Sequence, residues 1–127
     1  MNRGSSQLES RLREEIIEIC KSVHAHGWIA ATDGNVSVKL PGNRLLCTPS
    51  GVHKGHIGPK DLIITDMKGC KIKGEGEPTG EMAMHLACYE ERPDITAVVH
   101  THPPFTVAFS IAGSDHLTKP IIPEVVT

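Results

Sequence analysis

The chain has 127 residues, of which 39% are hydrophobic and 22% charged, and its formal net charge is −2 at pH 7. This composition is typical of one globular domain and argues against a disordered chain. The small net charge argues against nucleic acid or an anionic membrane as the main partner. No apolar run approaches the roughly 20 residues that a membrane span needs, and the first ten residues hold no apolar signal core. We therefore expect a cytoplasmic protein.

The first half of the chain predicts one helix followed by a hairpin. Apolar residues recur at steps of three and four, which indicates an amphipathic helix over residues 6–26. Ser6 and Glu9 have the spacing of a capping box, and Gly27 supplies a stop. Apolar runs over 36–40 and 44–48 flank a turn and predict a β-hairpin.

The second half predicts three further strands and two helices. Strands are expected over 62–65 and 70–73, joined by a tight turn. A helix is expected over 79–91, because Thr79 can cap it and Pro93 cannot continue it. A β-branched strand over 95–102 follows, and a last helix is expected over 105–112. These elements form one mixed α/β unit without repeats or linkers.

The cysteines and histidines give the first indications of chemistry. No pair of cysteines has the Cys-x-x-Cys spacing, so we expect four reduced and mostly buried thiols, at Cys20, Cys47, Cys70 and Cys88. The chain has eight histidines against one Trp, one Tyr and two Phe. That balance points towards a metal site.

The strongest local signal is the pair His100 and His102, at the end of what we interpret as a buried strand. Side chains at i and i+2 of a strand lie on the same face, so two imidazoles there can reach one metal ion. His24 and His26 have the same spacing, but they sit at a helix end, where i and i+2 diverge. We interpret that second pair as a favourable interaction with the helix C-terminus.

Glu81 lies in the first turn of the helix that precedes this strand. Its carboxylate could bind a metal or act as a general base, and pairing with the helix N-terminus would explain it equally well. His85 shares the same helix face, and its sequence position leaves open a role next to the metal ligands or a structural role. Three turns could cradle an anion through their backbone N–H groups, at Asp33-Gly34-Asn35, Thr48-Pro49-Ser50-Gly51 and Thr79-Gly80.

In this order the segments resemble the class II aldolase/adducin family, and within it most closely the L-fuculose-phosphate aldolases. The resemblance runs from the first helix to the last residue. The stretches that carry it are Gly34-Asn35-Val36-Ser37-Val38, Thr48-Pro49-Ser50-Gly51, Pro78-Thr79-Gly80-Glu81 with His85, and Arg92-Pro93-Asp94 through Val98-Val99-His100-Thr101-His102.

The resemblance implies a three-layer α/β/α domain with a mostly antiparallel central sheet, of which residues 1–127 form the N-terminal portion. It implies a homotetramer with active sites between subunits and one Zn²⁺ per subunit. Glu81, His100 and His102 are the implied zinc ligands, and Glu81 is also the implied catalytic residue. The substrate phosphate is expected at Gly34, Asn35, Ser50, Gly51, Thr79 and Gly80.

The implied activity is that of a metal-dependent aldolase, a lyase that reversibly cleaves a short ketose phosphate such as L-fuculose 1-phosphate. The products would be dihydroxyacetone phosphate and an aldehyde. The metal would act as a Lewis acid that stabilises the enediolate, while Glu81 moves the protons.

Several departures from the family pattern keep alternatives open. The third zinc histidine of the family belongs to a segment beyond Thr127, and His116 does not match it, so we expect the domain to be incomplete at its C-terminus. Thr79-Gly80 replaces a common Ser-Ser, which leaves a non-phosphorylated substrate open. Glu81 favours a lyase over a ribulose-phosphate 4-epimerase, but a methylthioribulose-phosphate dehydratase also fits it. A non-catalytic adducin-like module is the remaining alternative, and the visible ligands suit manganese and cobalt as well as zinc.

Overall fold

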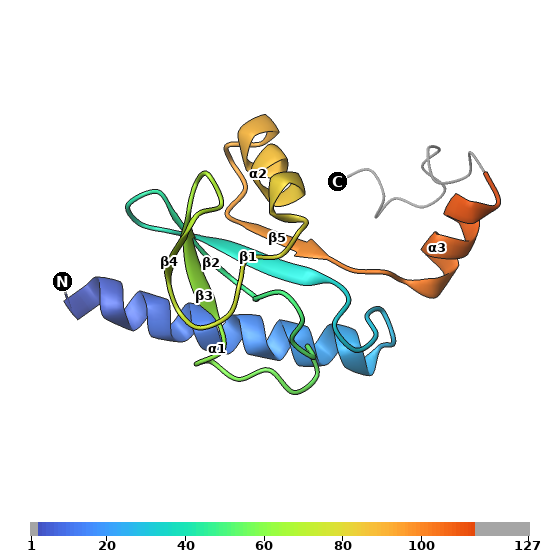
Figure 1. Cartoon of the computed structure of the whole chain (residues 1–127), viewed down its shortest axis with the longest axis horizontal. Coiled ribbons are helices and arrows are strands. Elements are labelled where there is room, and N and C mark those ends of the chain that lie inside the picture. The colour runs from blue at the N-terminus through green and yellow to red at the C-terminus, as the bar shows by residue number, and fades with distance from the viewer. Residues whose placement is uncertain (1–2, 114–127) are drawn as a thin grey trace.

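The computed structural model of the chain describes residues 3–113, and His116 lies outside them. Its elements follow the predicted order (Figure 1). They are α1 (Arg3–Ala25), β1 (Asn35–Leu40), β2 (Arg44–Cys47), β3 (Ile63–Asp66), β4 (Lys71–Lys73), α2 (Met82–Glu91), β5 (Ala97–His100) and α3 (Pro104–Ile111).

The five strands form one sheet in the order β4-β3-β2-β1-β5, and every neighbouring pair is antiparallel. Helix α1 lies along one face of this sheet and α2 lies on the other (Figure 1). The predicted three-layer α/β/α architecture with an antiparallel sheet is therefore confirmed. Helix α3 stands away from the sheet, and none of its residues is buried.

Strand alternation divides the core into two layers, because successive side chains point to opposite faces of a sheet. Towards α1, Val36, Leu46 and Ile64 pack against Ile16 and other apolar residues of that helix. Towards α2, a second cluster joins the helix to the sheet. Its fully buried members are Leu45, Cys47, Ile63, Met82 and Tyr89.

The hairpin is confirmed, since β1 pairs with β2 up to Leu40 opposite Arg44. The start of α1 differs from the prediction. The helix already includes residues before Ser6, so Ser6 cannot cap it, and Glu9 instead pairs with Arg13 at 2.8 Å, one turn away. At the other end, α1 stops at Ala25, and Gly27 has the left-handed φ of +69° that favours glycine.

Two more expectations need correction. Helix α2 begins at Met82 rather than at Thr79, because Thr79 forms a turn in which its Oγ1 accepts the Glu81 N–H at 3.3 Å. Strand β5 is not buried: its side chains are alternately exposed and half-buried. The reason is its position, since β5 is the outermost strand and pairs only with β1 among the described strands.

The cysteines are all free, but only Cys20 and Cys47 are buried, whereas Cys88 is half-buried and Cys70 is exposed. The expectation of mostly buried thiols is thus right for two of the four. Burial raises the pKa of Cys20 to about 11 and that of Cys47 to about 12. Within the described residues, no helix is both long enough and apolar enough to cross a membrane.

We expect these environments to order the thiols by reactivity. Because the thiolate is the reactive form, iodoacetamide at pH 8 should label Cys70 first and Cys88 more slowly. Cys20 and Cys47 should react only on unfolding. Peptide mass spectrometry against time measures this order, and rapid labelling of Cys47 in the folded chain would contradict the described core.

Gly34 provides a second test of the fold. A Cβ built there would lie 2.6 Å from Ile29 Cγ2 and 2.7 Å from the carbonyl oxygen of His100, and its φ is +67°. We expect Gly34→Ala to lower the free energy of unfolding by about 2–4 kcal/mol, since it adds both a clash and backbone strain.

Gly51→Ala is the matched control for Gly34→Ala. Gly51 has a similar φ of +70°, but a Cβ there meets nothing within 4 Å. Its substitution should cost only the backbone strain, about 1–2 kcal/mol. Urea denaturation of the two variants compares them, and equal losses would mean that the close approach to β5 is absent.

Candidate metal and substrate site

His100 and His102 lie together at the end of β5. His100 is the last residue of the strand, and His102 lies two residues beyond it, where its backbone N–H donates to the Trp28 carbonyl at 2.7 Å. The strand is therefore shorter than predicted, but the two rings still meet, with their Nε2 atoms 3.1 Å apart. Two nitrogens at this distance share one hydrogen or face one ion.

Glu81 meets this pair from the other side. It immediately precedes α2 as its N-cap residue, and its Oε2 lies 3.0 Å from His100 Nδ1. Glu81, His100 and His102 can each offer a ligand atom, and these atoms all lie within 4.8 Å of one another. Ligands on one tetrahedral zinc ion with bonds near 2.1 Å stand about 3.4 Å apart. His100 faces Glu81 with Nδ1 and His102 with Nε2, so the side chains would have to rotate to place one ligand atom of each on one ion.

The Glu81 carboxylate is also held by Asn35. The Asn35 Nδ2 donates to Glu81 Oε2 at 2.6 Å and lies 3.2 Å from Thr79 Oγ1. The pKa of Glu81 is lowered, chiefly by the Asn35 hydrogen bond and then by the nearby His100 and His102. Glu81 is therefore ionised at neutral pH, and one carboxylate with two imidazoles is a donor set that suits zinc and related divalent ions.

Behind Asn35 the site continues into the core. His85 is 1% exposed, and both of its ring nitrogens have partners, at Asn35 Oδ1 and at Ser37 Oγ. The two alternatives left open for His85 are thus not exclusive. It is a buried, satisfied histidine, and it also contacts the residue that holds Glu81.

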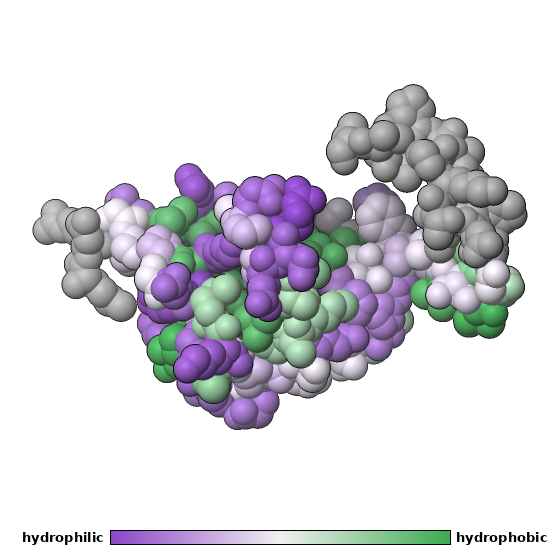
Figure 2. Space-filling model, turned by 90° about the horizontal axis from the view of Figure 1, so that it is seen from above, coloured by the Kyte–Doolittle hydropathy of each residue, from purple (hydrophilic) through white to green (hydrophobic). Residues whose placement is uncertain are grey.

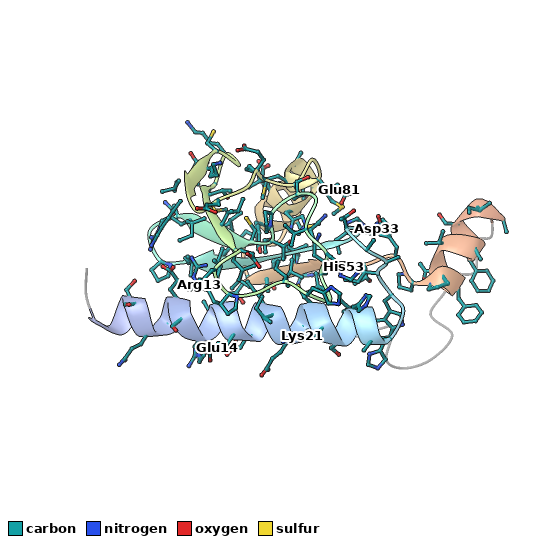
Figure 3. All side chains as sticks on the ribbon, turned by 60° about the horizontal axis from the view of Figure 1, so that its bottom comes forward. Arg13, Glu14, Lys21, Asp33, His53 and Glu81 are labelled. Carbon is teal, nitrogen blue, oxygen red and sulfur yellow. The ribbon has the colours of Figure 1, made fainter. Side chains whose placement is uncertain are left out.

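The three turns with anion-binding features converge beside Glu81. The Val36 N–H donates to Thr48 Oγ1 at 3.1 Å, and the Ser50 N–H donates to the Glu77 carbonyl at 2.8 Å. With the Asn35–Thr79 contact, these bonds tie together the segments 34–36, 48–51 and 77–81. Ser50, Gly51 and Gly80 are exposed there. Figure 3 places Glu81, Asp33 and His53 towards the same end of the molecule, above the C-terminal half of α1.

Lys54 was missed in the sequence. It is 2% exposed, and its Nζ donates to the carbonyl oxygens of Thr32 and Val52, each at 2.9 Å. It thus ties together the two loops that carry Asn35 and Ser50. Burial lowers its pKa, and no carboxylate among the described residues forms an ion pair with it. A single lysine in a polar loop carries no pattern that would reveal such burial.

The other His-x-His pair behaves as predicted. His26 Nδ1 lies 2.8 Å from the Ser22 carbonyl in the last turn of α1, and this carbonyl also accepts the His26 backbone N–H at 3.0 Å. The two rings diverge, His24 against His53 and His26 against Trp28. Among the described residues, only Glu81, His100 and His102 form a group that could hold a metal ion.

Comparisons with known proteins identify the family of this chain. Residues 14–127 match the family model described as the class II aldolase and adducin N-terminal domain. A methylthioribulose-1-phosphate dehydratase of Pseudomonas syringae pv. tomato is 40% identical over 108 residues, which cover 84% of this chain and 53% of the relative. An L-fuculose phosphate aldolase of Methanococcus maripaludis is 38% identical over 110 residues, covering 87% and 58%.

A solved structure gives the same result for the fold. YgbL of Escherichia coli, described as a putative aldolase/epimerase/decarboxylase, superposes with a TM-score of 0.76 at 35% identity, over 81% of this chain and 49% of that one. The chain thus spans about half the length of the relatives that it matches. The matched residues include every segment of the site described above, and the chain belongs to the class II aldolase and adducin family.

Proposed function

We propose that this chain carries the metal-binding and proton-transferring part of a lyase that acts on a short ketose phosphate. The observation that carries the proposal is the convergence of Glu81, His100 and His102 next to Asn35 and Thr79. The family alone would not decide it, since the family model also covers adducin domains. A purely structural module has no need of a carboxylate and two imidazoles that face one another.

The residues fit a divalent metal ion, and we propose zinc. Glu81, His100 and His102 would hold it, and a further ligand would have to come from outside the described residues or from solvent. Bound there, the metal would supply a Lewis acid that polarises a substrate carbonyl. Support comes from the donor atoms, one carboxylate oxygen and two imidazole nitrogens.

Glu81 is our proposed catalytic residue. Its Oε2 can leave Asn35 or His100 without disrupting the core, because its side chain is 47% exposed. Held at the N-terminal end of α2, Glu81 can take a proton from a substrate hydroxyl or from a carbon next to the carbonyl. We further propose that the substrate phosphate binds at Gly34, Asn35, Ser50, Gly51, Thr79 and Gly80.

The relatives support two reactions. In a dehydratase, loss of the proton next to the carbonyl is followed by loss of a β-hydroxyl as water. In an aldolase, loss of a hydroxyl proton is followed by carbon–carbon cleavage, which releases an aldehyde. The relatives named above include both activities at 40% and 38% identity. Both reactions begin with removal of a substrate proton, from carbon in one and from a hydroxyl in the other, and we propose this proton removal by Glu81 as the function.

We also propose a homotetramer, as the family resemblance implies. Support comes from the apolar side chains that α3 leaves exposed, among them Phe105 at 82% and Ile111 at 83%. Figure 2 shows hydrophobic surface gathered at this end of the molecule. Burying such side chains between subunits would contribute about 25 cal/mol per Å² of apolar area.

Metal content tests the proposed zinc site. We expect the chain, purified without chelator, to carry close to one zinc ion, and His100→Ala/His102→Ala to carry almost none. Inductively coupled plasma mass spectrometry measures both. The control is His24→Ala/His26→Ala, which removes a pair of the same spacing and should keep its zinc. Metal-free wild type would show that Glu81, His100 and His102 do not hold zinc without a further protein ligand, and zinc retained by His100→Ala/His102→Ala would reject both histidines as ligands.

The role of Glu81 is tested by the reaction rate and the products. We expect the zinc-loaded chain to consume methylthioribulose 1-phosphate or L-fuculose 1-phosphate, and Glu81→Gln to lower the rate by about 10²–10⁴-fold, the usual contribution of a general base. Mass spectrometry of the products separates the candidates. A product lighter by one water indicates a dehydratase and two fragments indicate an aldolase, whereas an unchanged mass with a new stereoisomer in the proton NMR spectrum indicates an epimerase. Unchanged rates in Glu81→Gln would remove Glu81 from the mechanism.

A further inference from the structure

A row of buried polar side chains leads from the core to the proposed metal site. Tyr89, Ser37, His85 and Asn35 are each between 0% and 4% exposed. The Tyr89 hydroxyl lies 2.8 Å from Ser37 Oγ, and Ser37 Oγ lies 2.7 Å from His85 Nδ1. His85 Nε2 then contacts Asn35 Oδ1, and Asn35 contacts Glu81. Burying a polar group costs free energy of folding unless the group forms hydrogen bonds, so the partners of each group in this row matter.

The orientation of the Asn35 amide follows from its neighbours. Its Nδ2 faces Glu81 Oε2 at 2.6 Å and Thr79 Oγ1 at 3.2 Å. A reversed amide would place its carbonyl oxygen against an ionised carboxylate, which has no hydrogen to share. The carbonyl oxygen must therefore face His85, and His85 Nε2 must carry the hydrogen of that contact.

The other ring nitrogen completes the assignment. Burial lowers the pKa of His85, which favours the neutral imidazole. A neutral imidazole with its hydrogen on Nε2 has an acceptor at Nδ1, and Ser37 Oγ can donate to it. The Tyr89 hydroxyl in turn donates to Ser37, with the Oγ at 2.8 Å and the carbonyl oxygen at 2.9 Å as its two acceptors. Every group in the row can thus be satisfied with His85 in a single tautomer.

We propose that His85 is a positioning residue for Glu81: its Nε2–H holds the carbonyl end of the Asn35 amide, so that the N–H end faces the carboxylate. The role rests on the proposed function, because Glu81 is there the metal ligand and base. Without a donor at position 85 the carbonyl end of the amide loses its partner, and only the contacts with Glu81 and Thr79 hold the amide in this rotation. An amide that turned would repel Glu81 and move it away from His100.

The test compares two substitutions of His85. Gln places an N–H₂ group close to the position of the imidazole Nε2 and can still donate to Asn35, whereas Met fills the space without a donor. Leu86→Ala is the control for a general loss of packing between α2 and the sheet. Leu86 belongs to α2 and packs against the apolar cluster there, but it is not part of the polar row. Zinc affinity is measured by competition with a chelating dye, and the thermal midpoint is measured on the same samples.

We expect His85→Met to weaken zinc binding by about 10-fold, the lower end of the loss that follows removal of a direct partner of a metal ligand, because His85 acts through Asn35. His85→Gln should stay within about threefold of wild type. Leu86→Ala should melt at a lower temperature but keep its zinc affinity. The proposal is overturned if folded His85→Met binds zinc like wild type, or if Leu86→Ala loses as much affinity as His85→Met.

An NMR measurement on the metal-free chain does not depend on zinc or on a folded Met variant. The ¹⁵N shifts of His85 should report hydrogen on Nε2, and the Asn35 side-chain N–H₂ signal should move in Glu81→Gln. Hydrogen on Nδ1 instead, or an Asn35 signal indifferent to Glu81, rejects the positioning role. A wild type that binds no zinc but passes this NMR test would reject zinc binding by the three residues alone and keep the hydrogen-bond arrangement.

Discussion

In β1, Asn35 lies opposite His100 and Ser37 lies opposite Val98. This antiparallel pairing joins residues about half a chain apart, and its register decides which side chains share a face. Asn35, Ser37 and His100 all point towards α2, where Glu81 and His85 lie. A slip of one residue would turn His100 to the α1 face. Gly34 protects the register, since its missing side chain lets the chain before β1 approach the His100 carbonyl.

The α2 layer is held by two different kinds of interaction. Apolar side chains such as Met82 and Leu86 contribute hydrophobic burial, which does not depend on the exact orientation of the helix. The polar row from Tyr89 to Asn35 adds direction, because each of its hydrogen bonds is satisfied only in one rotation of the helix against β1. Apolar packing would tolerate small shifts of α2, whereas the polar row does not. The helix therefore delivers Glu81 to a defined place beside His100.

Much of this could be predicted from the sequence, for identifiable reasons. The i, i+2 spacing predicted that His100 and His102 would meet, although His102 lies beyond the end of β5 and is held there by the Trp28 carbonyl. The order of the motifs indicated the family and its three-layer fold. The burial of β5 was predicted wrongly, because a β-branched run looks the same at the edge of a sheet as in its centre. The start of α2 was missed by three residues, since Thr79 can cap a helix or form a turn. The burial of Lys54 and the tautomer of His85 depend on contacts between distant segments, which no local pattern encodes.

The Asn35 amide has two hydrogens, and both are already engaged, by Glu81 and Thr79. A phosphate that claims either one must compete with a group of the protein itself. If the phosphate displaced Glu81, the carboxylate would lose the chief cause of its lowered pKa and become a stronger base. Substrate binding and the basicity of Glu81 would then be linked through a single amide group. In the empty site Glu81 would remain the weaker base.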